Sequence, residues 1–512
     1  MLRRFLKSLF RRGRAAPPMD EAERALRAAA DLSPAFLAGL RAASSAPGGD
    51  LPAPRPGARA IVLASCDPDY FRHFAIPFAD SLAKNAGAGV ALRLEIAGPD
   101  RWIDEEAAAL AAANPMLDIA CVAVPIAAGA AGDAARTFYA CARFRALPAW
   151  LRRHRLPVLV SDLDVLVTAP LGDALSRHAG ADAVVAQGRG DAEPWTRIAP
   201  SPLLVRPTPG GIAFAELAAA YVAHFLARGV APWGLDRVAI AAARADAERR
   251  APPSHVVVDG NWPLGPSLDH DPAAVTTPAF RAHLPRLRRV FGWTLPGTDM
   301  FFPMQLAHSA VLLGRPTWEG PMLEACLALC ARRRRALDIG AHVGFWSHWL
   351  AHHFERVEAF EPQPILQECL RANVPAANLR LHAVALGNRS GTVAGALDPR
   401  NTGMSHLVDA PGGDIRLEPL DRYAFDEVDF IKLDAEGYEL FVLQGAVDTL
   451  RRNRPLLLVE QAEWSARYGL APDAALAFLA SMGARVLRRM SKTDYLVGWD
   501  SADAWREPPA RS

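Results

Sequence analysis

Lysine is scarce in this sequence of 512 residues. It occurs only at Lys7, Lys84, Lys432 and Lys492. Arginine therefore supplies nearly all of the positive charge, which 55 acidic residues balance to a net charge of +2. A nearly neutral chain has no general electrostatic attraction to polyanions, so we do not expect it to bind nucleic acid.

Paired cysteines and long apolar runs are also missing. None of the six cysteines forms a C-x-x-C pair, and no cleavable signal precedes them, which favours small core residues in a reducing cytoplasm. The most apolar long stretch, near 211–230, still carries Glu216, His224 and Arg228. A membrane span needs about 18 or more uncharged apolar residues. The sequence predicts a cytoplasmic protein that does not span a membrane.

The N-terminal segment differs from the rest of the chain. Residues 1–14 carry six basic residues and no acid, with Leu and Phe at helical spacing. This pattern is typical of a short amphipathic helix on the anionic inner face of a membrane, or of a disordered basic tail. A linker rich in Pro, Gly and Ala follows at 46–58. We predict a tail and linker over 1–57 and two domains, over 58–290 and 295–500.

The first domain alternates strand and helix patterns, which predicts a doubly wound α/β fold with a parallel sheet. A helix around 137–153 leads to an apolar strand, Pro157 to Val167, that carries Asp162 and Asp164. Residues i and i+2 of a strand share one face, so both carboxylates would point together. They could hold Mn²⁺ or Mg²⁺ against a diphosphate leaving group, or simply cap a loop.

This domain resembles the GT-A class of nucleotide-sugar glycosyltransferases. The matching segments are Phe138-Tyr139, Arg143 to Leu147, Ser161 to Val167, Ala169-Pro-Leu171, Ser201 to Arg206 and Trp233-Gly-Leu-Asp236. The resemblance implies that Asp162 and Asp164 hold metal and diphosphate, and that Asp67 and Tyr70 lie beside the base of a nucleotide-sugar donor. Asp236 would be the general base toward an acceptor hydroxyl.

Two positions depart from the GT-A pattern. Arg237 stands where glutamine is commoner. A third metal ligand is not obvious either, because His255, His270 and His283 all lie near the end of the domain. These departures leave the activity of the domain open.

The second domain contains the segment Asp338-Ile-Gly-Ala-His-Val-Gly344, with Phe-Glu-Pro at 360–362. Gly340 and Gly344 allow a tight turn against a ligand before a helix begins. A dinucleotide site usually shows G-x-G-x-x-G, whereas here an acid stands where a phosphate would be repelled. A cationic, phosphate-free ligand such as S-adenosylmethionine fits better. Glu361 could then accept hydrogen bonds from both ribose hydroxyls.

A later strand of this domain carries a lysine and several acids. Lys432 and Asp434 share one face of the strand, and Glu436 follows at a turn made by Gly437. One interpretation is a structural ion pair, since a buried lysine needs an acidic partner. The other is that Asp434 faces the transferred methyl group or an acceptor hydroxyl. Further candidates for a general base are Glu436, His342 and His406.

The second domain resembles FkbM-type S-adenosylmethionine-dependent methyltransferases. The matching segments are 338–344, 360–362, 385–387, 401–403, 420–421, 430–439 and 443–446. The resemblance implies a Rossmann-like class I fold with S-adenosylmethionine as cofactor. The residues that would hold the cofactor are Asp338, Gly340, His342, Gly344, Glu361, Ala385 and Leu386. His342 departs from the pattern, because asparagine is usual there.

Together the two domains predict a bifunctional transferase. It would O-methylate and glycosylate a glycan, a glycolipid or a related small molecule, with Asp434 and Glu436 catalytic in one domain and Asp236 in the other. One alternative is a methyltransferase whose first domain is a degenerate acceptor-binding module. Another is a peripheral scaffold of polysaccharide assembly without catalysis. The sugar, the acceptor position, the stereochemistry and the oligomeric state stay open.

Overall fold

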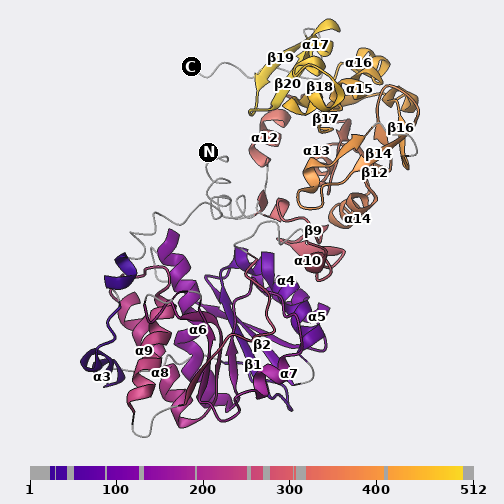
Figure 1. Ribbon diagram of the computed structural model, residues 1–512. Coiled ribbons are helices and arrows are strands. Elements are labelled where there is room, and N and C mark those ends of the chain that lie inside the picture. The colour runs from indigo at the N-terminus through magenta and orange to yellow at the C-terminus, as the bar shows by residue number, and fades with distance from the viewer. Residues whose placement is uncertain are drawn as a thin grey trace. The chain divides into compact units, whose positions relative to one another are not determined.

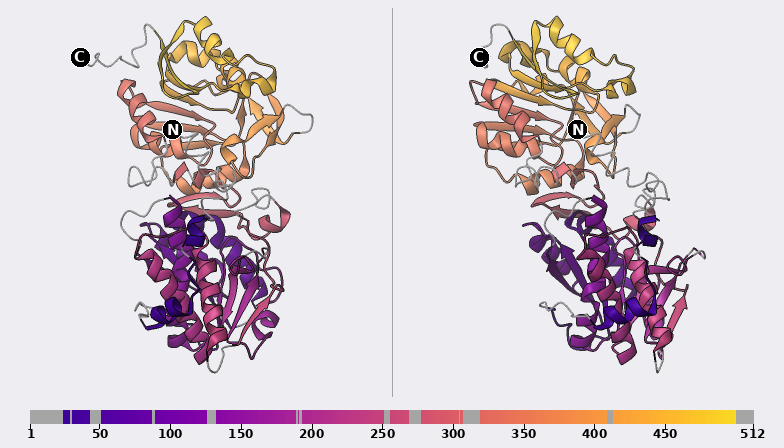
Figure 2. Two further views of the ribbon diagram at one scale, coloured as in Figure 1. Left: turned by 60° about the vertical axis from the view of Figure 1, so that its left-hand side comes forward. Right: turned by 90° about the vertical axis from the view of Figure 1, so that its left-hand side faces the viewer.

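Each half of the chain builds one seven-stranded sheet, and helices cover both faces of each sheet (Figure 1; Figure 2). The chain divides into two compact units, Met1–Leu284 and Pro285–Ser512. The computed structural model describes residues 24–28, 30–42, 51–86, 89–125, 132–188, 190, 193–250, 255–268, 277–303, 305–306, 319–408 and 413–499. The predicted basic helix at 1–14 and His270 lie outside these residues.

The sheet of the first unit has the order β3-β2-β1-β4-β6-β5-β7. Its strands are β1 (Ala60–Cys66), β2 (Val90–Ala97), β3 (Asp118–Val124), β4 (Val158–Val160), β5 (Ala183–Gln187), β6 (Ile198–Val205) and β7 (Val256–Asp259). The predicted parallel arrangement is correct for β3, β2, β1 and β4 but wrong for β6, which runs antiparallel to both neighbours. The reason is that β5 and β6 follow each other without a crossover helix, and directly connected strands pair antiparallel.

Helices enclose this sheet from two sides. They are α3 (Pro34–Ala42), α4 (Pro68–Asn85), α5 (Ile103–Ala113), α6 (Gly132–His154), α7 (Leu171–Ser176), α8 (Pro209–Leu226), α9 (Leu235–Arg249) and α10 (Pro278–Arg281). The helices α6, α8 and α9 pack together over one face, with α3 against α8, whereas α4 and α5 lie together on the other (Figure 1). The larger core forms under α6, α8 and α9 and includes Ile61, Leu63 and Trp150.

The helix α8 is long and apolar enough to cross a membrane by length and composition, with a mean hydropathy of 1.2. Its buried residues include Phe214, Leu217, Tyr221 and Val222, and these belong to the same core as α6 and α9. The apolar character of α8 is therefore explained by packing inside the first unit.

The sheet of the second unit has the order β12-β11-β10-β17-β18-β20-β19. Its strands are β10 (Arg335–Ile339), β11 (Arg356–Phe360), β12 (Leu379–His382), β17 (Val428–Leu433), β18 (Leu456–Glu460), β19 (Ala484–Arg489) and β20 (Asp494–Trp499). The strands up to β18 are parallel, and β20 runs antiparallel to β18. The chain proceeds from β10 outward to β12 and then returns to β17 on the other side of β10. A ligand crevice is expected where connections diverge in this way, at the carboxyl ends of β10 and β17.

Helices pack on both faces of the second sheet as well. They are α12 (Gly320–Leu329), α13 (Phe345–His353), α14 (Pro364–Asn373), α15 (Glu439–Gln444), α16 (Val447–Asn453) and α17 (Ala474–Ser481). Alternate residues of β17 enter different cores, because Phe430 packs with α12 and α13 whereas Ile431 and Leu433 pack with α15, α16 and α17. This alternation is the two-residue period of a strand buried on both sides.

Several elements of the second unit were not predicted. The strand β12 ends at His382, and β13 (Ala385–Leu386) belongs to a separate four-stranded sheet of order β13-β16-β14-β15. The other strands of that sheet are β14 (Gly391–Ala396), β15 (His406–Val408) and β16 (Ile415–Glu418). A two-stranded sheet of β8 (Leu287–Val290) and β9 (Trp293–Pro296) packs on α14. Short 3-10 helices are η3 (Thr402–Met404), η4 (Leu420–Tyr423) and η5 (Glu463–Tyr468).

The docking of α3 gives a test of the first core. Leu37 is 1% exposed, and replacing it with alanine should lower the free energy of unfolding of the first unit by about 2–5 kcal/mol, because a buried cavity forms. Urea unfolding followed by amide hydrogen exchange in β1 measures this change. The exposed neighbour Ala38, changed to serine, is the control. Equal stability of the two variants would show that α3 is not part of the core.

Candidate functional site

The candidate site begins where the loop after β10 meets the end of β17. Gly340 has a φ of +78°, and a Cβ atom there would lie 1.7 Å from the backbone oxygen of Asp434. The amides of Gly340 and Ala341 both donate to the Phe360 carbonyl, at 3.1 and 3.0 Å. Only glycine allows the loop to approach β17 this closely. The loop therefore crosses the carboxyl ends of three neighbouring strands.

Lys432 joins the loop to β17 through its ammonium group. Its Nζ donates to the Gly340 carbonyl at 3.2 Å and lies 3.1 Å from Oδ2 of Asp434, so the ion pair expected from the sequence is present. Burial opposes the charge of Lys432, but the neighbouring carboxylates of Asp434, Asp338 and Glu319 outweigh burial and raise the pKa above its usual range. Lys432 is a buried cation surrounded by acids.

Asp338 lies at the end of β10 and is completely buried. Its Oδ2 accepts a hydrogen bond from the Ser347 hydroxyl at 2.6 Å, whereas Oδ1 has no partner among the described residues. Burial raises the pKa of Asp338, and the charge of Lys432 opposes that rise. A buried acceptor without a donor is costly, so this position suits a ligand that brings a hydrogen-bond donor or a positive charge.

Glu361 follows β11 directly and is 4% exposed. Its two carboxylate oxygens accept hydrogen bonds from the amides of His342, at 2.9 Å, and Gln363, at 2.8 Å. Burial raises the pKa of Glu361 to about 7, although the hydrogen bonds from these two backbone amides oppose the rise. Each carboxylate oxygen can accept a second hydrogen bond, so the acid is held in place and still able to bind hydroxyl groups.

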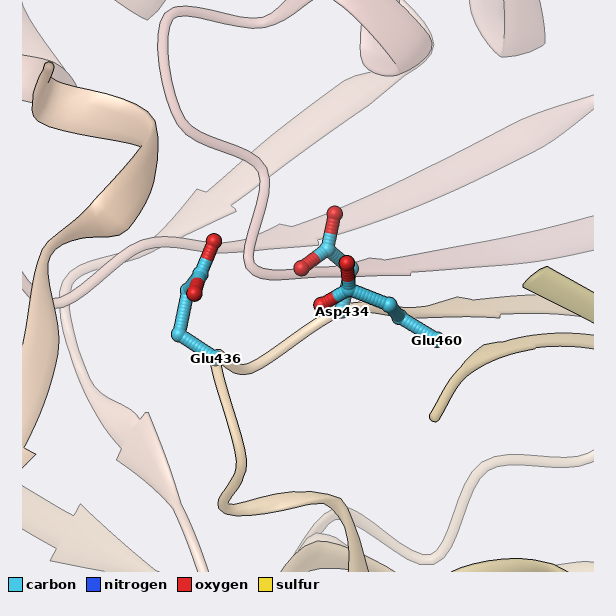
Figure 3. Close-up of side chains that lie close together, drawn as sticks. All are labelled: Asp434, Glu436 and Glu460. Carbon is cyan, nitrogen blue, oxygen red and sulfur yellow. The ribbon is translucent and has the colours of Figure 1, made fainter. Parts of the chain in front are cut away.

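Asp434, Glu436 and Glu460 bring three carboxylates together, with their nearest oxygens within 4.8 Å of one another (Figure 3). Burial and the neighbouring carboxylates raise the pKa of Glu436 to about 9 and that of Glu460 to about 11. One oxygen of each glutamate is buried without a partner among the described residues. Glu436 and Glu460 are therefore protonated at neutral pH, which leaves them able to donate hydrogen bonds while Asp434 pairs with Lys432.

Three non-glycine residues with left-handed backbone lie around Lys432. The φ angles are +52° for His342, +54° for Glu436 and +59° for Glu319. Such conformations cost about 1–3 kcal/mol each and persist where the surroundings enforce them, most often at functional sites. Glu319 precedes α12 and accepts a hydrogen bond from Nε1 of Trp346, and burial raises its pKa to about 7. No sequence pattern pointed to Glu319.

The remaining predicted residues of the second unit have different local contacts. Ala385 and Leu386 are buried in β13, in the same apolar cluster as Phe360. His406 begins β15, and its Nδ1 lies 3.2 Å from the Met404 carbonyl. Gly344 precedes α13, and a Cβ there would lie 2.8 Å from a methyl of Val374, so Gly344 serves close helix packing. The role of Ala385 and Leu386 in holding the cofactor stays a prediction.

In the first unit, the predicted strand through Val167 is wrong, because β4 ends at Val160. Its antiparallel neighbour β6 pairs with only three residues of β4, and the chain then turns into a loop. Asp162 and Asp164 lie in this loop, so they do not share the face of a strand. The side chain of Asp162 is 39% exposed, whereas Asp164 is buried and accepts a hydrogen bond from the Ser267 hydroxyl.

Arg143 of α6 connects two of the predicted residues. Its guanidinium donates to the Ser161 carbonyl at 2.7 Å and lies 2.6 Å from the Asp162 carboxylate. Asp236, in the first turn of α9, is also within electrostatic reach of Arg143. Burial raises the pKa of Asp236, and the charge of Arg143 opposes that rise. Arg143, Asp162 and Asp236 therefore form one charged group.

The other predicted residues of the first unit have local partners. Asp67 caps α4 by accepting a hydrogen bond from the Tyr70 amide at 2.7 Å, which places both residues at the carboxyl end of β1. Nδ1 of His255 lies 3.3 Å from the Gly180 carbonyl. Nδ1 of His283 lies 2.7 Å from the Asp80 carboxylate.

Comparison with known proteins identifies the domain of the second unit. Residues 338–486 match the model of the methyltransferase FkbM domain. The second unit contains an FkbM methyltransferase domain, as the sequence motifs predicted. None of the curated proteins compared with the chain matches it.

Among solved structures, SMU.1697c of Streptococcus mutans, a candidate methyltransferase in complex with SAH, has 14% identity. The match covers 35% of this chain and 94% of that one, with a TM-score of 0.23. Galactosyltransferase LgtC with donor and acceptor sugar analogs matches at 15% identity over 39% and 72% of the chains, with a TM-score of 0.29. The bifunctional glycosyltransferase WbbM matches at 13% identity over 42% and 40%, with a TM-score of 0.28. The last two resemble the N-terminal half.

Replacing Gly340 with alanine tests the approach of the loop to β17. The added methyl would collide with the Asp434 backbone and the residue would keep a left-handed φ, so the Tm of the second unit should fall by several degrees, about 2–4 °C per kcal/mol lost in a unit of this size. Calorimetry measures the Tm. Gly403→Ala is the matched control, because the nearest atom to a Cβ there is 3.4 Å away. An unchanged Tm for Gly340→Ala would contradict the close approach.

Because Glu460 keeps its proton in the folded protein, we expect the stability of the second unit to depend on pH. Folding raises the pKa of Glu460 from 4.5 to about 11, so the folded protein keeps a proton that the unfolded chain releases. This destabilises the fold increasingly as pH rises above the unfolded value. Glu460→Gln should therefore raise the Tm at about pH 8 and leave it unchanged near about pH 4. Exposed Glu463→Gln is the control. A Tm difference independent of pH would show that Glu460 is ionised in the fold.

Proposed function

We propose that this protein is a bifunctional transferase that O-methylates and glycosylates one glycan, glycolipid or related acceptor. The observation that carries the proposal is the FkbM methyltransferase domain, whose crevice at β10 and β17 is lined with acids around Lys432. The acceptor would be a small molecule, a glycan or a glycolipid on the inner face of the cell membrane. Residues 1–14 would provide a reversible contact with that membrane.

The residues of the second unit fit S-adenosylmethionine. Oδ1 of Asp338 is a buried acceptor without a partner among the described residues, and Glu361 is held at the end of β11 with capacity for further hydrogen bonds. The absence of a side chain at Gly340 lets the loop lie directly against the backbone of Asp434, which follows β17. The cofactor supplies an electrophilic methyl group on a sulfonium cation. An acid-lined crevice suits that positive charge.

Asp434 is the proposed general base for an acceptor hydroxyl. Its side chain is 36% exposed, and its Oδ2 lies 3.1 Å from the ammonium group of Lys432. Protonated Glu436 and Glu460 would donate hydrogen bonds that orient the acceptor oxygen. Alignment of an in-line displacement provides much of its acceleration, and the base removes the proton released by the hydroxyl.

The first unit is the proposed glycosyltransferase. Asp162 and Asp164 offer carboxylate oxygens of the kind that Mn²⁺ or Mg²⁺ takes, at the end of β4. Asp67 and Tyr70 would lie beside the nucleotide base at the end of β1. Asp236 would be the general base toward the acceptor, and burial raises its pKa in the direction that favours this role.

A second candidate function is methyl transfer alone, with the first unit binding the acceptor. The contacts of Asp162 and Asp164 favour this second function. Arg143 already neutralises Asp162, and Asp164 already accepts a hydrogen bond from the Ser267 hydroxyl. Calorimetry distinguishes the two functions. Heat from S-adenosylmethionine together with heat from a nucleotide sugar plus manganese supports the bifunctional enzyme, whereas heat from the methyl donor alone supports the second candidate.

Radiolabelled methyl donor and radiolabelled nucleotide sugars, supplied with a bacterial glycolipid extract, test both activities at once. Glu361→Ala should reduce methyl labelling by about 100-fold and spare sugar labelling, and Asp162→Ala should do the reverse, because each acid serves one transfer. Exposed Asp173→Ala is the control for the first unit. Sugar transfer that survives Asp162→Ala would refute the metal assignment, and a wild-type protein without methyl labelling would refute the main proposal.

A further inference from the structure

Three side chains from separate segments of the second unit form one chain of hydrogen bonds. The Thr402 hydroxyl and backbone amide both donate hydrogen bonds to Oδ2 of Asp299, and the hydrogen bond from the amide is 3.1 Å long. Nε2 of His342 lies 2.7 Å from the Thr402 hydroxyl oxygen. Asp299 is fully buried and Thr402 is 1% exposed. The three residues connect the segment before α12, the helix η3 and the glycine loop.

Backbone contacts hold Asp299 in place. Its Oδ1 accepts hydrogen bonds from the amides of Phe301, at 3.0 Å, and Phe302, at 2.9 Å. The amides of Met300 and Phe301 in turn donate to the Arg400 carbonyl, at 2.9 and 3.1 Å. With Oδ1 occupied by two amides, Oδ2 is the oxygen that faces Thr402.

The position of the Thr402 hydroxyl proton decides which nitrogen of the His342 ring carries a proton. Thr402 has a single hydroxyl proton, which it donates to Asp299, so its oxygen can only accept from His342. Burial and, to a smaller extent, the charge of Lys432 lower the pKa of His342 to about 4, so the ring is neutral at physiological pH. A neutral ring with its proton on Nε2 has a lone pair on Nδ1. No described residue forms a hydrogen bond with that Nδ1.

The ring lies between two parts of the candidate site. The His342 amide donates to Glu361, the acid proposed to hold the ribose. The charges of Lys432 and Asp434, the pair proposed for methyl transfer, act on the ring. The edge of Phe302 packs against it, with ring centroids 5.2 Å apart at 73°. Nδ1 is therefore an acceptor within the region that both ligands would occupy.

We propose that Asp299 is a positioning residue of the methyl-transfer site. Through the Thr402 hydroxyl it holds His342 as the Nε2–H tautomer, and Nδ1 then accepts a hydrogen bond from a hydroxyl of a bound ligand. The hydroxyl belongs either to the ribose of the methyl donor or to the acceptor. This inference rests on the proposed methyltransferase function. It adds that Asp299 keeps Nδ1 of His342 able to accept a hydrogen bond from a ligand hydroxyl.

Asp299→Asn reverses the chain of hydrogen bonds. The amide oxygen stays with the Phe301 and Phe302 amides, so the NH₂ group faces Thr402 and donates to its hydroxyl oxygen. The Thr402 proton then turns to Nε2 of His342, which becomes an acceptor and moves the ring proton to Nδ1. Thr402→Ser keeps the hydroxyl and is the conservative control. Asp398→Asn changes the same loop, where Asp398 accepts from the Arg400 amide at 2.9 Å, without touching the relay.

The tautomer is measured in the ligand-free full chain by ¹⁵N NMR of labelled histidine, with His342→Asn identifying the signal. We expect Nε2–H in the wild type, Thr402→Ser and Asp398→Asn, and Nδ1–H in Asp299→Asn. If Asp299→Asn does not fold, Thr402→Val replaces it and should give a mixture of tautomers. An Nε2–H ring alone in Asp299→Asn, or in Thr402→Val where it replaces that variant, would overturn the proposal.

Calorimetry with S-adenosylmethionine and acceptor kinetics then identify the hydroxyl. A loss of about tenfold in donor affinity in Asp299→Asn, with Thr402→Ser unchanged, assigns the hydroxyl to the ribose. Unchanged donor affinity with about a tenfold fall in the rate of methyl labelling of the bacterial glycolipid extract assigns it to the acceptor. No change in either would refute the ligand contact. A wild-type protein that does not bind the donor would instead refute the proposed function, and the tautomer of the free protein would still stand.

Discussion

The second unit depends on one buried ammonium group. Lys432 bonds to the Gly340 carbonyl and pairs with Asp434, so a single side chain ties the glycine loop to the end of β17. Burying that charge is expensive unless acids surround it, and Asp338 and Glu319 meet this requirement. A structural need to stabilise one cation thus produces a site suited to a second, mobile cation such as a sulfonium.

The acids around this group are differentiated by their surroundings. Asp434 lies next to the ammonium and is partly exposed, whereas Glu436 and Glu460 are more buried and hold protons. Carboxyl groups so close together cannot all be ionised, and separating their roles provides an acceptor and donors in one place. Asp338 and Glu361 lie deeper, and both are fixed by hydrogen bonds to the loop and helix that follow β10. The proposed chemistry and the proposed cofactor binding therefore use different acids of one network.

The two units hold the acidic side chains at the ends of their strands with different partners. In the second unit a glycine loop packs on β17, and the acids are fixed by backbone amides and by Lys432. In the first unit, Asp162 is fixed by Arg143, and Asp164 by a hydroxyl. The guanidinium of Arg143 next to Asp162 neutralises it and also interacts electrostatically with Asp236 of α9. This charged group is the feature of the first unit that joins residues predicted separately.

The sequence alone determined what local patterns encode. The D-x-G-x-x-x-G loop, Glu361 and the Lys432–Asp434 strand were readable because each function needs a fixed spacing within one strand or turn, and the FkbM match confirms the domain. Tertiary structure decided the rest. The end of β4 at Val160 depends on how far β6 pairs with it, and the four-stranded sheet depends on contacts between distant strands. Asp299 reaches His342 only through Thr402, across 103 and then 60 residues of chain, and no periodicity encodes such contacts.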